Sequence, residues 1–158
     1  MVKRLIEPNT TFYPAAVGLI TTGADRPNVM TCNRMASCSA EPPRLSISIR
    51  PARFSHGLIR STGEFVLNLP TPGQALLADC PVNIECAVEH ELDLDSHTLF
   101  IGRVLAVHAE ESVLDANGDV DLSRAGGIAY GWGKVRERPT YNFQVETLRS
   151  QVHGARAG

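Results

Sequence analysis

Apolar and polar side chains alternate with a period of two over most of this chain, and this pattern constrains the fold more than any other feature. In residues 82–94, apolar residues occupy every second position from Val82 to Val88. Successive side chains of a strand point to opposite faces, so this run predicts a long strand with one buried face. Residues 98–109 are apolar on both faces, which predicts a partner strand that is covered on both sides.

Shorter segments of the same kind predict four more strands, at residues 15–23, 29–34, 45–50 and 65–69. The apolar spacing of Phe54, Leu58 and Ile59 predicts a short helix that Gly63 ends. A doubly wound parallel sheet needs a helix between successive strands, and these intervals are too short to hold one. The GxGxxG fingerprint of a Rossmann domain is also absent. We therefore expect an all-β barrel with one or two short helices.

Length and charge narrow the class of protein further. The chain has 158 residues, and we expect one domain over residues 1–149 and a frayed C-terminal tail over residues 150–158. The formal net charge of −2 and the pI of about 6.2 give no electrostatic reason to expect a nucleic acid or an anionic membrane as partner. The first apolar run, residues 15–20, is too short to span a membrane. We expect a soluble cytoplasmic protein.

The segment from Ser46 to Ser61 is the strongest candidate for a binding site. It reads as a strand with one polar face that turns at Pro51 and enters the predicted helix, with Arg50 and Arg53 on either side of the turn. A helix N-terminus offers unpaired N–H groups and a partial positive charge, which favour a phosphate. The same pattern is also typical of a solvated sheet edge followed by a capped helix. The residues alone leave both interpretations open.

Motifs of other functional classes are missing. The chain has no GxSxG, no HExxH and no carboxylate pair placed for acid–base catalysis, so we predict no catalytic side chain. Cys32 and Cys38, like Cys80 and Cys86, are six residues apart, which is wider than the usual spacing in metal sites. Cys86 also follows the apolar phase of its strand and is expected to be a small core residue. We predict no metal site and no disulfide.

Four blocks of the sequence, in the same order, resemble the flavin reductase-like family of FMN-binding split-barrel proteins, which includes the flavoredoxin type. The blocks are PNVMTCNRMASCSAEPPRLSISIRPARFSHGLI, GEFVLNLP, CPVNIECAVEHEL and SHTLFIGRVLAVHAEE. The resemblance implies a six-stranded antiparallel Greek-key split barrel and a homodimer with FMN at the subunit interface. It also implies an oxidoreductase that passes hydride or electrons from NAD(P)H through FMN to flavin or another acceptor, because in such proteins the cofactor carries the redox chemistry.

The resemblance also implies which residues hold FMN. Residues 35–39 correspond to the segment along the flavin ring and ribityl chain, residues 48–56 to the phosphate end, and Asn68 and His97 to positions near the ring. The implied cofactor-binding residues are Met35, Ala36, Ser37, Cys38, Ser39, Ser48, Arg50, Arg53, Ser55, His56, Asn68 and His97. Structural roles compete with several of them: Ser37 and Ser39 as caps of the next turn, Asn68 as a turn residue, and His97 as a strand-start residue bonded to a carbonyl.

The chain departs from the family pattern in two places. Only nine residues, Thr71–Asp79, connect the GEFVLNLP block with the CPVNIECAVEHEL block, where family members carry a longer segment over the flavin. The region after Ser123 also matches poorly, and its Trp132 has packing and a flavin contact as alternative roles. Two other functions therefore stay open: an FMN-bearing electron carrier without a specific nicotinamide site, and a non-catalytic barrel that serves as an interaction module.

Overall fold

The structure is a computed structural model that describes residues 3–8, 10, 15–23, 25–71, 77–130 and 140–142. The expectations for Trp132, for the tail at 150–158 and for most of the 71–79 connection lie outside the described residues. In the described part, no helix is both long enough and apolar enough to cross a membrane.

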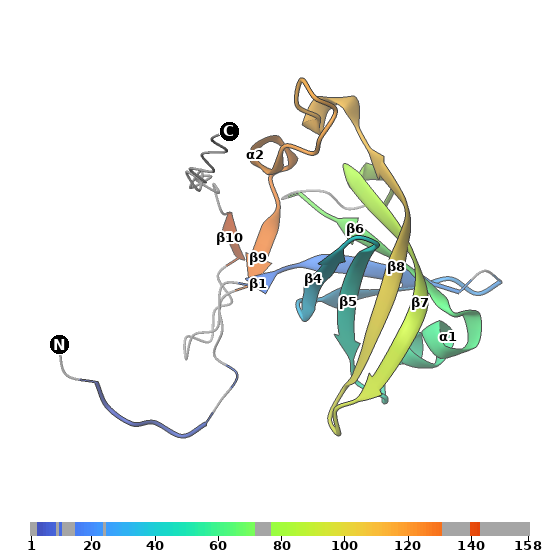
Figure 1. The fold of residues 1–158 in the computed structure, drawn as a ribbon, viewed down its shortest axis with the longest axis vertical. Helices are drawn as coiled ribbons and strands as arrows, with labels where there is room; N and C mark the ends of the chain where they lie inside the picture. Colours follow the sequence, from blue (N-terminus) through green and yellow to red (C-terminus); the bar gives the residue numbers. More distant parts are fainter. Residues whose placement is uncertain are drawn as a thin grey trace, which may run out of the picture.

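The described chain is mostly β, with two antiparallel sheets and two helices (Figure 1). The larger sheet has the strand order β3-β2-β6-β7-β8-β5-β4. Its strands are β2 (Gly18–Thr22), β3 (Asn28–Cys32), β4 (Met35–Ala40), β5 (Pro43–Ile49), β6 (Glu64–Leu69), β7 (Val82–Asp93) and β8 (Thr98–Ala109). The smaller sheet, in the order β1-β9-β10, consists of β1 (Ala15–Ala16), β9 (Ile128–Tyr130) and β10 (Thr140–Asn142). The helices are α1 (Phe54–Thr62) and α2 (Leu122–Ala125), and single 3-10 turns lie at Leu77–Asp79 and Glu111–Val113.

The order of the strands forces the large sheet to curl into a split barrel. Its two edge strands, β3 and β4, are consecutive in the chain and only Asn33 and Arg34 separate them. Three peptide units reach about 11 Å at most, so the opposite edges of a seven-stranded sheet have to meet. The amide of Ser48 at the end of β5 donates to the carbonyl of Arg34 at 2.8 Å across this junction. We call the junction, residues 30–34 and 48–50, the seam of the barrel.

The predicted all-β barrel is confirmed, with seven strands in the main sheet instead of six. The additional strand is β4, whose Ala, Ser and Cys residues lack the apolar alternation that marks the other strands. It is a strand because β5 pairs with it along its length, with a bulge between Ser37 and Ser39. The segment predicted as one strand over residues 15–23 is divided between β1 and β2.

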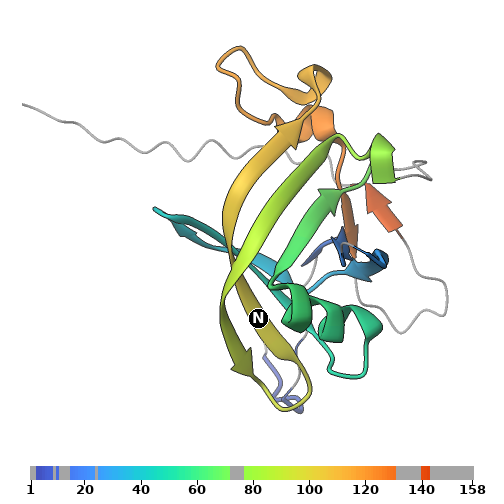
Figure 2. The same ribbon diagram turned by 90° about the vertical axis from the view of Figure 1, so that its right-hand side faces the viewer.

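Helix α1 confirms the prediction from the apolar spacing of residues 54–59. It ends at Gly63, which adopts the left-handed conformation (φ 72°), and the Gly63 amide donates to the carbonyl of Ile59 at 2.8 Å. Ile59 is fully buried, and the helix packs against β2, β3 and β6 (Figure 2). The helix thereby closes one open end of the barrel.

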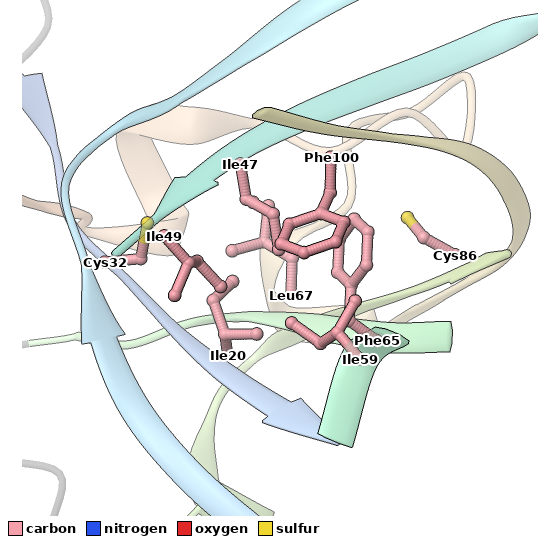
Figure 3. Close-up of a cluster of buried hydrophobic side chains, with 9 residues drawn as sticks. All are labelled: Ile20, Cys32, Ile47, Ile49, Ile59, Phe65, Leu67, Cys86 and Phe100. Atoms are coloured by element: carbon pink, nitrogen blue, oxygen red, sulfur yellow. The ribbon is translucent and has the colours of Figure 1, made fainter. Parts of the chain in front are cut away.

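The barrel interior holds one apolar core, drawn in Figure 3. Its buried members are Ile20, Cys32, Ile47, Ile49, Ile59, Phe65, Leu67, Cys86 and Phe100. The expected core role of Cys86 is confirmed, since it is 1% exposed and burial raises the pKa of its thiol to about 11. A Cβ added at Gly102 would lie 2.8 Å from Cε1 of Phe65 and 2.9 Å from Cβ of Cys86, so only glycine lets these strands approach.

The prediction that β8 is covered on both sides is wrong for its second half. Leu105 and Val107 are 56% and 53% exposed. The register explains the difference, because β5 pairs with β8 only from Thr98 to Arg103. Beyond that point β8 pairs with β7 alone, and no other strand of the described part of the chain pairs with it.

Candidate functional site

A cavity of about 540 Å³ lies at the seam of the barrel. Three parts of the chain line it: the end of β3 with the two residues that follow, the end of β5 with the turn into α1, and the loop between β7 and β8. Its lining residues are Met30, Thr31, Cys32, Asn33, Arg34, Ser48, Ile49, Arg50, Arg53 and His97. No carboxylate is among them, so the cavity is strongly electropositive.

The charges of the three cavity arginines are uncompensated. Within the described chain, Arg34, Arg50 and Arg53 form no ion pair, and no acidic side chain lines the cavity with them. Most of the other described arginines have a partner. Arg44 and Arg103 pair with Glu89 at 2.7 and 3.3 Å, Arg60 with Glu91 at 3.0 Å and Arg124 with Asp121 at 3.3 Å, while Arg26 lies 5.5 Å from the ring centroid of Phe54. Unpaired guanidinium groups gathered in one cavity are chemically suited to a phosphate or another multivalent anion.

The start of α1 adds to this positive field. Arg53 is the N-cap residue of the helix, and its side chain makes no capping hydrogen bond. The first N–H groups of α1 therefore lack a side-chain acceptor. An anion held by Arg53 lies near the positive end of this helix dipole.

The pKa of His97 is affected by the same positive electrostatic field. Its pKa is lowered, first by burial and then by the positive charges of Arg34 and Arg50. Nδ1 of the ring lies 2.9 Å from the hydroxyl of Ser96. The ring is thus held neutral over a wider pH range than an exposed histidine, and it offers a hydrogen-bonding group to a ligand at the cavity wall.

Four of the predicted binding residues meet at the cavity: Ser48, Arg50, Arg53 and His97. Sequence reasoning missed Asn33 and Arg34, although Arg34 follows the end of β3 as Arg50 follows the end of β5. That similarity, an arginine within two residues of the end of a strand, was the available signal. The pairing of Ser48 with Arg34 that brings the two arginines to one cavity is a long-range contact.

Ser55 and His56 were predicted at the phosphate end, and the structure places their side chains away from the cavity. The hydroxyl of Ser55 accepts a hydrogen bond of 2.6 Å from Nδ2 of Asn28. Nε2 of His56 lies 2.8 Å from the hydroxyl of Thr98, and its ring meets that of Phe100 edge-on. Successive residues of a helix project about 100° apart, so these two side chains leave α1 in directions other than that of Arg53.

Asn68 also lies outside the cavity lining. It is buried, and its amide nitrogen donates to the carbonyl of Leu19 at 2.9 Å and to the hydroxyl of Thr21 at 3.1 Å. Its carbonyl oxygen accepts from Nδ2 of Asn83 at 2.8 Å. These bonds connect β2, β6 and β7, which gives Asn68 a structural role in the barrel.

Residues 35–39 form most of β4, the outermost strand at the seam. Ala36, Ser37 and Cys38 are exposed, while Met35 and Ser39 are half-buried. One side of β4 pairs with β5, and its other side has no strand neighbour in the described chain. The predicted contact of this segment with a flavin ring stays a prediction, and β4 begins directly after Arg34 of the cavity lining.

The residues at the seam fit the phosphate of FMN and offer no site for a metal. Three guanidinium groups and the Ser48 hydroxyl are all donors for a phosphate dianion. Among the described residues, no group of three His, Cys, Asp or Glu side chains is placed to hold a metal ion. The fold and the site together define a split-barrel protein with an electropositive cavity at its seam.

Comparison with known proteins gives the family. Residues 10–78 and 70–122 match the flavin reductase like domain, and the chain belongs to this family. An NADH-dependent flavin reductase, StyB of Pseudomonas fluorescens, is 27% identical over 142 aligned residues, which cover 68% of this chain and 83% of the relative. The family resemblance seen in the sequence is thereby confirmed.

Solved structures show the same fold. Flavoredoxin from Methanosarcina acetivorans superimposes with a TM-score of 0.79 at 18% identity, over 94% of this chain and 97% of that one. The FMN-binding protein from Thermus thermophilus gives a TM-score of 0.68 at 22% identity, over 88% of this chain and 96% of the other. At these identities the likeness concerns the split-barrel fold alone.

Proposed function

We propose that this protein is a flavin reductase that binds FMN, with the phosphate of the cofactor in the seam cavity. The observation that carries the proposal is the gathering of Arg34, Arg50 and Arg53, all without ion-pair partners in the described chain, in one carboxylate-free cavity. Such a site favours a terminal phosphate dianion. FMN has one, whereas riboflavin has no phosphate and FAD carries its phosphates within a diphosphate bridge.

The strength of the site agrees with cofactor binding. Hydrogen bonds to charged groups are worth about 1.5–3 kcal/mol each. Three or four of them approach the roughly 8 kcal/mol that a micromolar dissociation constant represents, before ordering of the ligand is subtracted. When bound, FMN supplies the capacity to accept hydride from a nicotinamide and to pass electrons on. The arginines and Ser48 hold its phosphate, and His97 contributes a neutral hydrogen-bonding ring at the wall.

The proposed electron donor is NADH or NADPH, and the acceptor is free flavin or another small molecule. The relative StyB, by its name, uses NADH to reduce flavin. Because the cofactor carries the redox chemistry, no acid–base side chain is required of the protein. We place the reaction in the cytoplasm, since all four cysteines are free thiols.

We further propose that the active form is a homodimer in which the second chain completes the flavin site. Two features support this. β4 borders the cavity as an edge strand with exposed residues, and edge strands of this kind favour pairing with another chain. Leu105 and Val107 add exposed apolar area on β8. Light scattering on the flavin-loaded protein tests the dimer, and a monomer with full FMN stoichiometry would exclude it.

Two measurements test the proposed function. Flavin-free protein is titrated with FMN, FAD and riboflavin while flavin fluorescence is followed. We expect FMN to bind at least about tenfold more tightly than riboflavin, the equivalent of one charge-assisted bond. Equal binding of riboflavin would refute the phosphate site.

The second measurement adds NADH or NADPH to the FMN-loaded protein without oxygen. Loss of the yellow absorbance supports a reductase. Retention of colour with both donors, when dithionite still bleaches the flavin, would show an electron carrier instead. Absence of flavin binding at any tested concentration would leave only the interaction module.

A further inference from the structure

Two hydrogen bonds connect the first turn of α1 to the starts of β3 and β8. Ser55 and His56, adjacent in the chain, are 1% and 6% exposed. The Ser55 hydroxyl bonds Asn28 at the start of β3, at 2.6 Å. His56 bonds the hydroxyl of Thr98 at the start of β8, at 2.8 Å, and Thr98 is itself 5% exposed. We call these two bonds the clamp.

The clamped turn is the one that carries the cavity arginines. The amide of Arg53 donates to the carbonyl of Arg50 at 3.0 Å, and the amide of His56 donates to the carbonyl of Arg53 at 3.0 Å. These two backbone hydrogen bonds connect His56 with the backbone of Arg53 and Arg50, whose guanidinium groups belong to the cavity. At the other end of the second clamp bond, Thr98 follows His97, which lines the same cavity. The His56–Thr98 bond therefore connects the two segments that supply Arg53 and His97 to the cavity lining.

We propose that Ser55 and His56 are positioning residues of the anion site, which act through Arg53 and Arg50 without touching the ligand. The inference rests on the proposed phosphate site. Long guanidinium side chains hold a phosphate well only when their backbone is fixed, because disorder of the turn is a loss that binding has to overcome. The neighbours that fix such a turn then contribute to affinity for the phosphate and not for the rest of the ligand. A buried histidine–threonine bond with no contact to the cavity has this role.

The test compares FMN with riboflavin in variants of the clamp. Thr98→Val removes the hydroxyl at nearly constant volume, and Thr98→Ser restores it. We expect Thr98→Val to weaken FMN binding about fivefold, equivalent to about 1 kcal/mol, and to change riboflavin binding by less than about twofold. Thr98→Ser should recover most of the FMN affinity. With saturating FMN, kcat should stay within about twofold of the original, so the change appears in the KM for FMN.

Thr22→Val is the matched control. Thr22 is a buried threonine whose hydroxyl donates to the carbonyl of Glu64 at 2.9 Å and lies 3.4 Å from that of Thr62, at the other end of α1. It should lower thermal stability as Thr98→Val does, because each loses a buried hydrogen bond. It should leave the ratio of FMN to riboflavin affinity unchanged. If both variants lowered the ratio of FMN to riboflavin affinity to a similar extent, the effect would reflect general stability and not the positioning of the arginines.

A double-mutant cycle tests whether the clamp acts through Arg53. In an Arg53→Ala background, Thr98→Val should weaken FMN binding by less than about twofold, because the group that it positions is gone. A full fivefold loss in that background, or an equal loss of riboflavin binding in the single variant, would overturn the proposal. Should Thr98→Val fail to fold, Ser55→Ala breaks the other clamp bond and the same two comparisons apply. A starting protein that does not distinguish FMN from riboflavin would refute the phosphate site itself, and the clamp with it.

Discussion

Replacement of Arg50 by alanine tests the electrostatics of the seam directly. Arg50 lines the cavity, has no ion pair in the described chain, and is one of the two arginines that lower the pKa of His97. Loss of one or two charge-assisted hydrogen bonds amounts to about 1.5–3 kcal/mol each in a protected site. Arg50 is exposed, so solvent screening places the effect in the lower part of that range. We expect FMN to bind about ten- to a hundredfold more weakly.

The assay is a fluorescence titration of flavin-free protein at two salt concentrations. Riboflavin affinity should be unchanged, and the loss for FMN should shrink as salt increases, because surface-accessible charges are screened. Arg44→Ala is the control, since it removes an arginine that pairs with Glu89 outside the cavity. FMN binding that survives Arg50→Ala unchanged, or that falls equally in Arg44→Ala, would refute the assignment of the phosphate to this cavity.

The remaining predictions concern the core and the cavity wall. Gly102→Ala should destabilise the fold by about 1–3 kcal/mol in urea denaturation, because its methyl group overlaps the buried Phe65 ring. Gly57→Ala in α1, where an added Cβ meets nothing within 4 Å, should stabilise it by about 0.5–1 kcal/mol. Stabilisation by Gly102→Ala, or destabilisation by Gly57→Ala, would contradict the packing described around these two residues. By NMR titration, the lowered pKa of His97 should rise when FMN binds, because a dianion offsets the guanidinium charges, and it should also rise in ligand-free Arg50→Ala. Protons are therefore taken up on binding, and FMN affinity should increase as pH falls between the two titration midpoints. A midpoint that does not move would place the phosphate elsewhere.

The sequence predicts the barrel well wherever one face of a strand is buried. Residues 82–94 become β7, and the helix at residues 54–59 ends at Gly63 as expected, because both patterns record burial against a core. β4 was not predicted as a strand, since an edge strand of small residues takes its structure from β5 and not from its own alternation. The exposed half of β8 was missed for a related reason, as side-chain type does not tell how far a neighbouring strand extends.

The site was predictable to the extent that its residues are close in sequence. Arg50 and Arg53 come from one turn and meet at the cavity as expected. Ser55 and His56 were grouped with them because they are adjacent, although the helix turns their side chains toward β3 and β8. Arg34 joins the cavity lining only because the seam closes, and this closure depends on the order of all the strands in the sheet. No local pattern contains that information.

The position of the cavity at the seam also links ligand binding to the rate at which the protein unfolds. Residues of β3, of β5 and of the loop before β8 line the cavity, and they come together only when β5 has paired with β8, about a third of the chain away in sequence. A ligand held there binds the closed barrel and not its opened forms, so it stabilises the protein by about 2.7 kcal/mol at a hundredfold excess over its Kd. If the seam closes late in folding, nearly all of that stabilisation slows unfolding and little of it speeds folding. The supply of flavin in the cell would then set how long each molecule lasts before it opens to a protease.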